Sequence, residues 1–180
     1  MPTPFSVEVL KDLFCHMEWA DAAVWRAVLA QPHAARDEAL RGLFCHLHNV
    51  QRAFLHVWQG EELTLREPTE FPDAADLVSW ARPYYAMARL FLDDVDPHAL
   101  GQPVLMPWLA EFEQRVGRAL QAPVLAETMF QVTSHSTYHR GQVNLRLRAV
   151  GGEPPLVDYI AWIWFGRPRP EWDTGTPAAG

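Results

Sequence analysis

The sequence has 180 residues, of which 49% are hydrophobic and 21% are charged, a balance typical of one soluble globular domain. Its formal net charge is −7, Lys11 is the only lysine and the arginines are scattered, which argues against binding to nucleic acid or to an anionic membrane surface. The chain also lacks the roughly 18 consecutive apolar residues of a membrane span and the basic, then apolar, start of a signal peptide, so we expect a cytoplasmic protein.

Two long amphipathic helices are predicted toward the N-terminus. The first follows Ser6, a residue suited to cap a helix, and ends before Pro32. Its apolar residues recur mostly at intervals of three and four: Leu10, Leu13, Phe14, Met17, Val24 and Val28. The second begins near Asp37 and ends at Gly60, and the residues of its apolar face are Leu40, Leu43, Leu47, Val50, Phe54 and Trp58.

A third helix is predicted over residues 73–94, and Pro83 inside it should kink the helix or delay its start. Residues 95–123 give a poor signal because prolines and glycines divide them into short pieces. Within that stretch, residues 104–106 are compatible with a short strand, and residues 109–120 with a short helix or a hairpin.

A long fourth helix is predicted over residues 124–150, and two glycines followed by two prolines end it. Residues 156–165 are apolar and aromatic, as is typical of a short packed helix, whereas residues 166–180 are rich in Pro and Gly and are expected to form a flexible tail. The sequence therefore predicts an all-α fold: a four-helix bundle of residues 1–165 with a long crossover between the third and fourth helices.

The predicted fourth helix carries His135 and His139, the only two histidines of the chain that are four residues apart. On a helix this spacing places two imidazoles on one face, near enough to bind the same metal ion. The pair continues an apolar stripe that is expected to face the core and comprises Val132, Val143, Leu147 and Val150. Imidazole nitrogens in a core need partners, which either a metal ion or hydrogen bonds to Ser, Thr or Tyr would supply.

A metal site with two histidines needs a further ligand from another helix. His46 shares a face of the predicted second helix with apolar residues, whereas His48 and His56 share their faces with polar residues and are expected to point to solvent. His46 is therefore the best candidate. His16, at the edge of the first helix's apolar stripe, is a weaker one.

Other metal motifs are absent from the sequence. There is no Glu-x-x-His, which argues against a di-iron carboxylate bundle. There is also no His-Glu-x-x-His, which argues against a zincin protease, and no glycine-rich phosphate loop.

Two motifs of this chain resemble those of the DinB/YfiT superfamily. The C-terminal one runs His135-Ser-Thr-Tyr-His139-Arg-Gly-Gln142 and continues with Leu145, Leu147, Gly151 and Pro154. The other comprises His46-Leu47 and Phe54-Leu55, and the opening of the family is matched by Trp19-Ala20-Asp21. The resemblance covers roughly residues 6–165 and implies a four-helix bundle, often dimeric, in which His46, His135 and His139 bind Zn²⁺, Ni²⁺ or a similar divalent ion. Gln51 stands where the family often has Glu.

The resemblance also implies a function, because some relatives are thiol S-transferases that join a low-molecular-weight thiol, such as bacillithiol or mycothiol, to an electrophile. We therefore expect a metal-dependent thiol S-transferase acting on a small-molecule substrate in stress response or detoxification. Arg140 or Gln142 are candidates to hold the thiol, with a surface salt bridge or a helix cap as the alternative for both.

Two other functions stay open at this point. One is a metal-dependent hydrolase, for which Asp158 and Tyr159 are the only candidates as a general base. The other is a non-enzymatic metal-binding protein of the stress response. The aromatic residues Trp162 and Trp164 are candidates for a homodimer interface, although burial on their own bundle explains them equally well.

Overall fold

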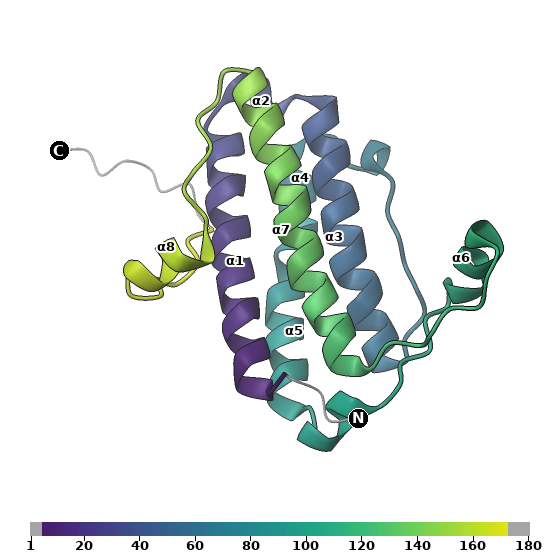
Figure 1. The fold of residues 1–180 in the computed structure, drawn as a ribbon. Helices are drawn as coiled ribbons and strands as arrows, with labels where there is room; N and C mark the ends of the chain where they lie inside the picture. The colour runs from purple at the N-terminus through teal and green to yellow at the C-terminus, as the bar shows by residue number, and fades with distance from the viewer. Residues whose placement is uncertain (1–4, 173–180) are drawn as a thin grey trace.

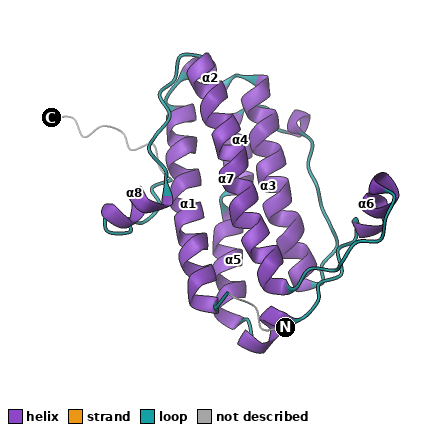
Figure 2. Ribbon diagram, viewed as in Figure 1, coloured by secondary structure: helices purple, strands orange, loops and turns teal. Residues whose placement is uncertain are grey.

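The computed structural model describes residues 5–172, and its centre is a bundle of long helices (Figure 1). In this bundle α7 packs between α1 and α3, and the bounds of these three helices are Val7–Leu29 for α1, Glu38–Gln59 for α3 and Leu125–Ala149 for α7. Two shorter helices in succession fill the fourth position: α4 at Ala74–Ala81 and α5 at Pro83–Asp94. The predicted all-α fold is confirmed, since residues 5–172 contain no strand (Figure 2).

Short helical elements connect the long helices. Their bounds are Pro32–Ala35 for α2, Pro68–Glu70 for η1, Pro97–Gly101 for η2, Leu109–Val116 for α6 and Tyr159–Trp164 for α8. Residues 104–106 of the crossover do not form the short strand considered above; an isolated bridge pairs Pro103 with Val124 instead. Of the two structures compatible with residues 109–120, the helix is found, and this α6 stands out to one side of the bundle while α8 lies on the opposite side (Figure 1).

Local sequence signals account for the helix boundaries. The side chains of Ser6 and Asp37 each accept a hydrogen bond from the backbone N–H three residues further on, which caps α1 and α3. Gly60 ends α3 with a φ of 68°, in the left-handed region that suits glycine. Pro83 is the first residue of α5, where its missing N–H is not needed, so the predicted third helix is divided at this point.

Two apolar clusters form the core, one toward each end of the bundle. The first draws on α1, α3, α5 and α7 and includes Leu10, Phe14, Met17, Leu55, Tyr84, Met129 and Val132. The second draws on α1, α3, α4 and α7 and includes Val24, Trp25, Phe44, Leu77, Val143 and Leu147. Between the two clusters α1, α3 and α7 contribute buried polar side chains, here called the polar layer: Asp21, His48, Gln51, Ser136 and Arg140.

The carboxylate of Asp21 lies at the centre of the polar layer. Its Oδ1 accepts a hydrogen bond from Arg140 Nη1 at 2.7 Å, within an ion pair whose side chains are 2% and 3% exposed. Its Oδ2 accepts from Gln51 Nε2 at 2.9 Å and from the Tyr85 hydroxyl at 2.5 Å. The surface salt bridge considered as an alternative role for Arg140 is wrong, because Arg140 is buried on the inward face of α7 and pairs with Asp21 of α1.

His48 also belongs to the polar layer, so the prediction that it points to solvent is wrong. The Trp25 indole N–H donates to His48 Nε2 at 2.9 Å, and His48 Nδ1 donates to Gln51 Oε1 at 2.8 Å. Burial lowers the pKa of His48 to about 4, so the ring is neutral at neutral pH. The prediction failed for a physical reason. Helix α3 packs against α4, α5 and α7, and its His48 and Gln51 also bond to Trp25 and Asp21 of α1, so residues on several of its faces are buried.

The end of the described chain packs against α1. Residues 166–172, which fall in the predicted flexible tail, include Trp172, whose indole N–H donates to Glu18 at 3.2 Å. The remaining part of that predicted tail, residues 173–180, lies outside the described residues. The division of the chain at residue 165 stays a prediction.

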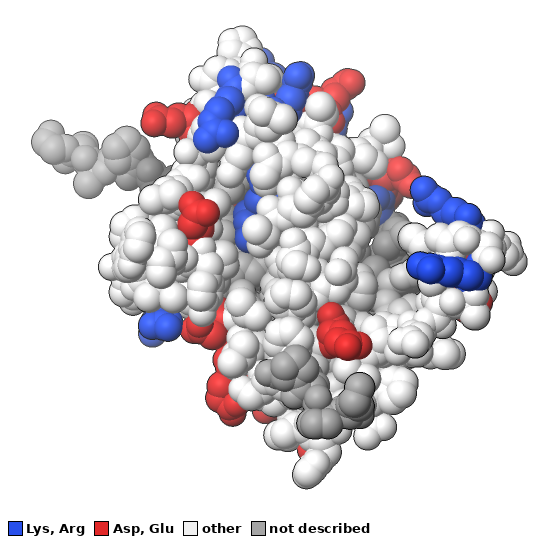
Figure 3. Space-filling view, viewed as in Figure 1, with Lys and Arg blue, Asp and Glu red and all other residues white. Residues whose placement is uncertain are grey.

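The surface of the bundle bears charged side chains of both signs, spread over the face seen in Figure 3. Trp162 is buried and Trp164 is 74% exposed, so of these two aromatic residues only Trp164 offers apolar surface. The homodimer itself stays a prediction. Among the described residues, no helix is long and apolar enough to cross a membrane.

The Asp21–Arg140 pair generates a stability prediction. Replacing Arg140→Met leaves a buried carboxylate without its cation, which we expect to lower the free energy of unfolding by about 3–5 kcal/mol. The double variant that also carries Asp21→Asn should lose less free energy of unfolding than the two single variants lose together, because neither charge is then left unpaired. Urea unfolding measures these changes. Lys11→Met, which removes an exposed ion pair with Asp93, is the control and should cost under about 1 kcal/mol. An equal cost for Arg140→Met would contradict the prediction.

Candidate metal centre

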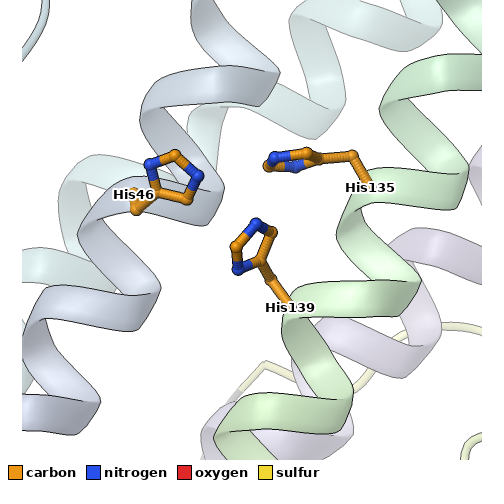
Figure 4. A group of neighbouring side chains, drawn as sticks. All are labelled: His46, His135 and His139. Carbon is orange, nitrogen blue, oxygen red and sulfur yellow. The ribbon is translucent and has the colours of Figure 1, made fainter.

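Three histidines from two helices converge at the surface where α3 and α7 pack side by side, a strip of surface that is called the α3–α7 groove below. His46 comes from α3, and His135 and His139 come from successive turns of α7 (Figure 4). Their ring centroids are 5.3 Å apart for His46 and His135, 4.6 Å for His46 and His139, and 4.2 Å for the pair on α7. One nitrogen of each ring lies within 4.8 Å of the other two. Since imidazole nitrogens bind Zn²⁺ at about 2.1 Å, small side-chain rotations suffice to place all three on one ion.

The cluster lies at the edge of the bundle and not in its core. His46 is exposed, and His135 and His139 are half-buried. The expectation that the pair on α7 faces the core is therefore wrong, although Val132, from the same stripe, is fully buried. Each of the two histidines directly precedes an inward-facing residue of α7 and is rotated from it by about 100°. This offset leaves the imidazoles accessible to a solute in the groove.

The electrostatics of the cluster favour the neutral forms of His46 and His135. Burial, followed by the proximity of His139 and then His46, lowers the pKa of His135 to about 4. Burial, followed by the proximity of His139, also lowers the pKa of His46. A neutral imidazole carries the lone pair that a metal ion needs. The Nδ1 atom of His135 is buried and makes no hydrogen bond, so it is a polar atom for which a bound cation would supply a partner.

Gln142 orients one of these rings. Its Oε1 lies 2.7 Å from His139 Nδ1, and a carbonyl oxygen can only accept, so His139 donates from Nδ1 and keeps its lone pair on Nε2. A hydrogen bond of this kind sets the tautomer and direction of a metal-binding histidine. Gln142 therefore acts as a positioning residue for His139.

The other histidine candidates lie elsewhere. His16 Nε2 is 2.9 Å from the backbone oxygen of Val157, on the α1 side of the bundle, and His48 lies in the polar layer. His56 Nδ1 is 2.8 Å from the backbone oxygen of Glu62. Within the part of the chain that the structure describes, no other group of three His, Cys, Asp or Glu side chains converges in this way, and no fourth such side chain joins the three histidines.

Fold and site together define a class of protein: a four-helix bundle with three histidines from two helices meeting in one groove. The sequence model of the DinB family matches residues 8–173. The match covers nearly the whole chain, so the protein belongs to the DinB family, and the resemblance stated from its motifs is confirmed. A search of curated proteins finds no match to the chain.

The cluster predicts a measurable metal content. Protein purified after loading with Zn²⁺ or Ni²⁺ should carry about one ion per chain, and His135→Ala and His139→Ala should each remove most of it, because each takes away one of three ligands. Elemental analysis measures the content. The control is His56→Ala, on α3 but outside the cluster. Unchanged metal content in both α7 variants would exclude this site.

Gln142 gives a separate prediction about affinity. Gln142→Leu removes the acceptor that orients His139 and should weaken metal binding by about 10- to 100-fold while the three ligands remain. Gln142→Glu keeps an acceptor at the same position and should retain the affinity. A competition titration against a chromogenic chelator measures both variants, and equal affinity of the Leu variant and the unaltered protein would show that Gln142 does not support the site.

Proposed function

We propose that this DinB-family protein is a metal-dependent thiol S-transferase, which joins a low-molecular-weight thiol to a small electrophile in stress response or detoxification. The observation that carries the proposal is a set of three imidazoles that lie together at the bundle surface, with no fourth His, Cys, Asp or Glu side chain joining them among the described residues. Sites that keep coordination positions open are typical of catalytic metal ions, whereas structural zinc sites are closed by four protein ligands.

His46, His135 and His139 are the residues that would hold the ion, with Zn²⁺ or Ni²⁺ as the best candidates. Three neutral ligands leave a divalent ion its full charge, and such an ion lowers the pKa of a thiol or a water molecule in its open position. Gln142 keeps His139 Nε2 directed at the site.

The lack of a nearby base favours transfer over hydrolysis. Tyr159 donates a hydrogen bond to Asp12 of α1, and with its neighbour Asp158 it lines a cavity between α1 and α7, away from the groove of the histidines. Gln51, where the family often has Glu, is fully buried and bonded to Asp21. A bound metal ion would lower the pKa of water as well as that of a thiol, but amide hydrolysis also needs a group that passes a proton to the departing amine. Replacement of a halide by a thiolate needs no such group, because the halide leaves as an anion.

The test uses the metal-loaded protein with 1-chloro-2,4-dinitrobenzene as electrophile and bacillithiol, mycothiol, cysteine or glutathione as thiol. We expect thioether formation that requires both thiol and metal and falls by about 100-fold or more in His139→Ala. His56→Ala should keep the activity. Cleavage of amide substrates without any thiol would favour the hydrolase instead, and metal binding with no turnover of any tested pair would favour a non-enzymatic role.

A further inference from the structure

A cavity opens between α3 and α7, the two helices that carry the histidine cluster, and none of the three histidines lines it. It has a volume of about 380 Å³ and lies between α3, α6 and α7. Aromatic and aliphatic side chains form most of its lining, among them Phe54, Trp108, Leu109, Phe112 and Leu120, and Gln131 lies at its α7 side. We call this cavity the crossover pocket, because most of it is built from the segment between α5 and α7.

We infer that the crossover pocket binds the aromatic part of a neutral electrophile, and this inference rests on the proposed function of the neighbouring histidines. Its occupant is a small molecule with one or two rings. The argument uses the position of the pocket along the groove, the chemistry of its lining and its size.

The pocket begins one helical turn from the histidine cluster. Gln131 precedes His135 by four residues on α7, which corresponds to about 6 Å along the helix axis. Phe54 follows His46 by eight residues on α3, or about 12 Å. The two steps run in the same direction along the groove, because α3 and α7 are antiparallel. Farther in that direction the two helices are still in contact, since Trp58 Nε1 of α3 donates a hydrogen bond to Thr128 of α7 at 2.9 Å. A molecule of ordinary substrate size can therefore reach both places at once.

The lining favours a neutral aromatic group. Phe54 and Trp108 already meet edge to face with ring centroids 5.5 Å apart, an arrangement that a further ring can extend. None of the described residues that line the pocket is Lys or Arg. Its one acidic side chain, Glu127, accepts a hydrogen bond from the backbone N–H of Val124 at 2.8 Å. The lining itself thus offers an anionic ligand a carboxylate and no cation, and the nearby Arg115 is engaged with the Phe112 ring, its guanidinium carbon 6.0 Å from the ring centroid.

The size of the pocket and its exposed wall also favour a small aromatic ligand. A volume of about 380 Å³ lies at the lower end of the range for small-molecule sites, which suits one or two rings. The wall provided by α6 contains no buried residue, and Phe112 is 46% exposed although it lines the pocket. A ring bound there would cover apolar surface that is now in contact with water.

Equilibrium dialysis of the metal-loaded protein with 1,3-dinitrobenzene, without thiol, tests the inference, because this neutral ring lacks a leaving group and binds without reacting. Phe112→Ala should weaken binding by about fivefold, as expected for the loss of one aromatic contact. The matched control is Val116→Ala, a residue of the same helix with 49% exposure that does not line the pocket. The anionic ring 3,5-dinitrobenzoate should bind at least about tenfold more weakly.

The kinetic counterpart separates this inference from the proposed function. In the transferase assay Phe112→Ala should raise KM for 1-chloro-2,4-dinitrobenzene by about fivefold and leave KM for the thiol and the metal content unchanged. Two results would contradict the assignment of the crossover pocket as the site of the aromatic ring. One is thiol transfer together with equal binding of 1,3-dinitrobenzene by Phe112→Ala and the unaltered protein. The other is binding of 3,5-dinitrobenzoate as tightly as the neutral ring. Pocket binding without thiol transfer would leave the pocket standing and refute the transferase.

Discussion

The buried carboxylate of Asp21 constrains the helices of the bundle against one another. It is stable away from water only while Arg140, Gln51 and Tyr85 all reach it, and these residues come from three different helices. The apolar clusters on either side can repack after a small displacement at modest cost, whereas a half-satisfied polar layer is strongly unfavourable. The polar layer therefore determines how α1, α3, α5 and α7 are rotated and aligned.

The candidate metal centre depends on this alignment. Ser136 and Arg140 of α7 are bonded in the polar layer, and His135 and His139 each directly precede one of them. Once Ser136 and Arg140 face inward, the two histidines must lie at the α3 side of α7, where His46 meets them. The residues that stabilise the core thus also place the cluster in a groove, where a solute can reach it and where the crossover pocket follows.

The helix boundaries were predictable because they depend on neighbouring residues in the chain. Caps at Ser6 and Asp37, the left-handed Gly60 and the break at Pro83 act within one helical turn, so the sequence carries them locally. The direction in which a side chain points depends less on its neighbours in the chain. His48 was expected in solvent because polar residues share its face, yet Trp25 and Gln51 bury it through contacts that no periodicity shows.

The sequence by itself determined the all-α bundle, the family and the identity of the three histidines that come together, because helical periodicity and motif spacing are properties of the chain. Only the tertiary structure decided that these histidines lie at the bundle surface, that Arg140 is buried against Asp21 and that α6 forms one wall of a pocket between α3 and α7. The reason is physical: α7 packs against two partners at once, and which of its faces is inward depends on how both partners are placed. A single helix pattern does not contain that information.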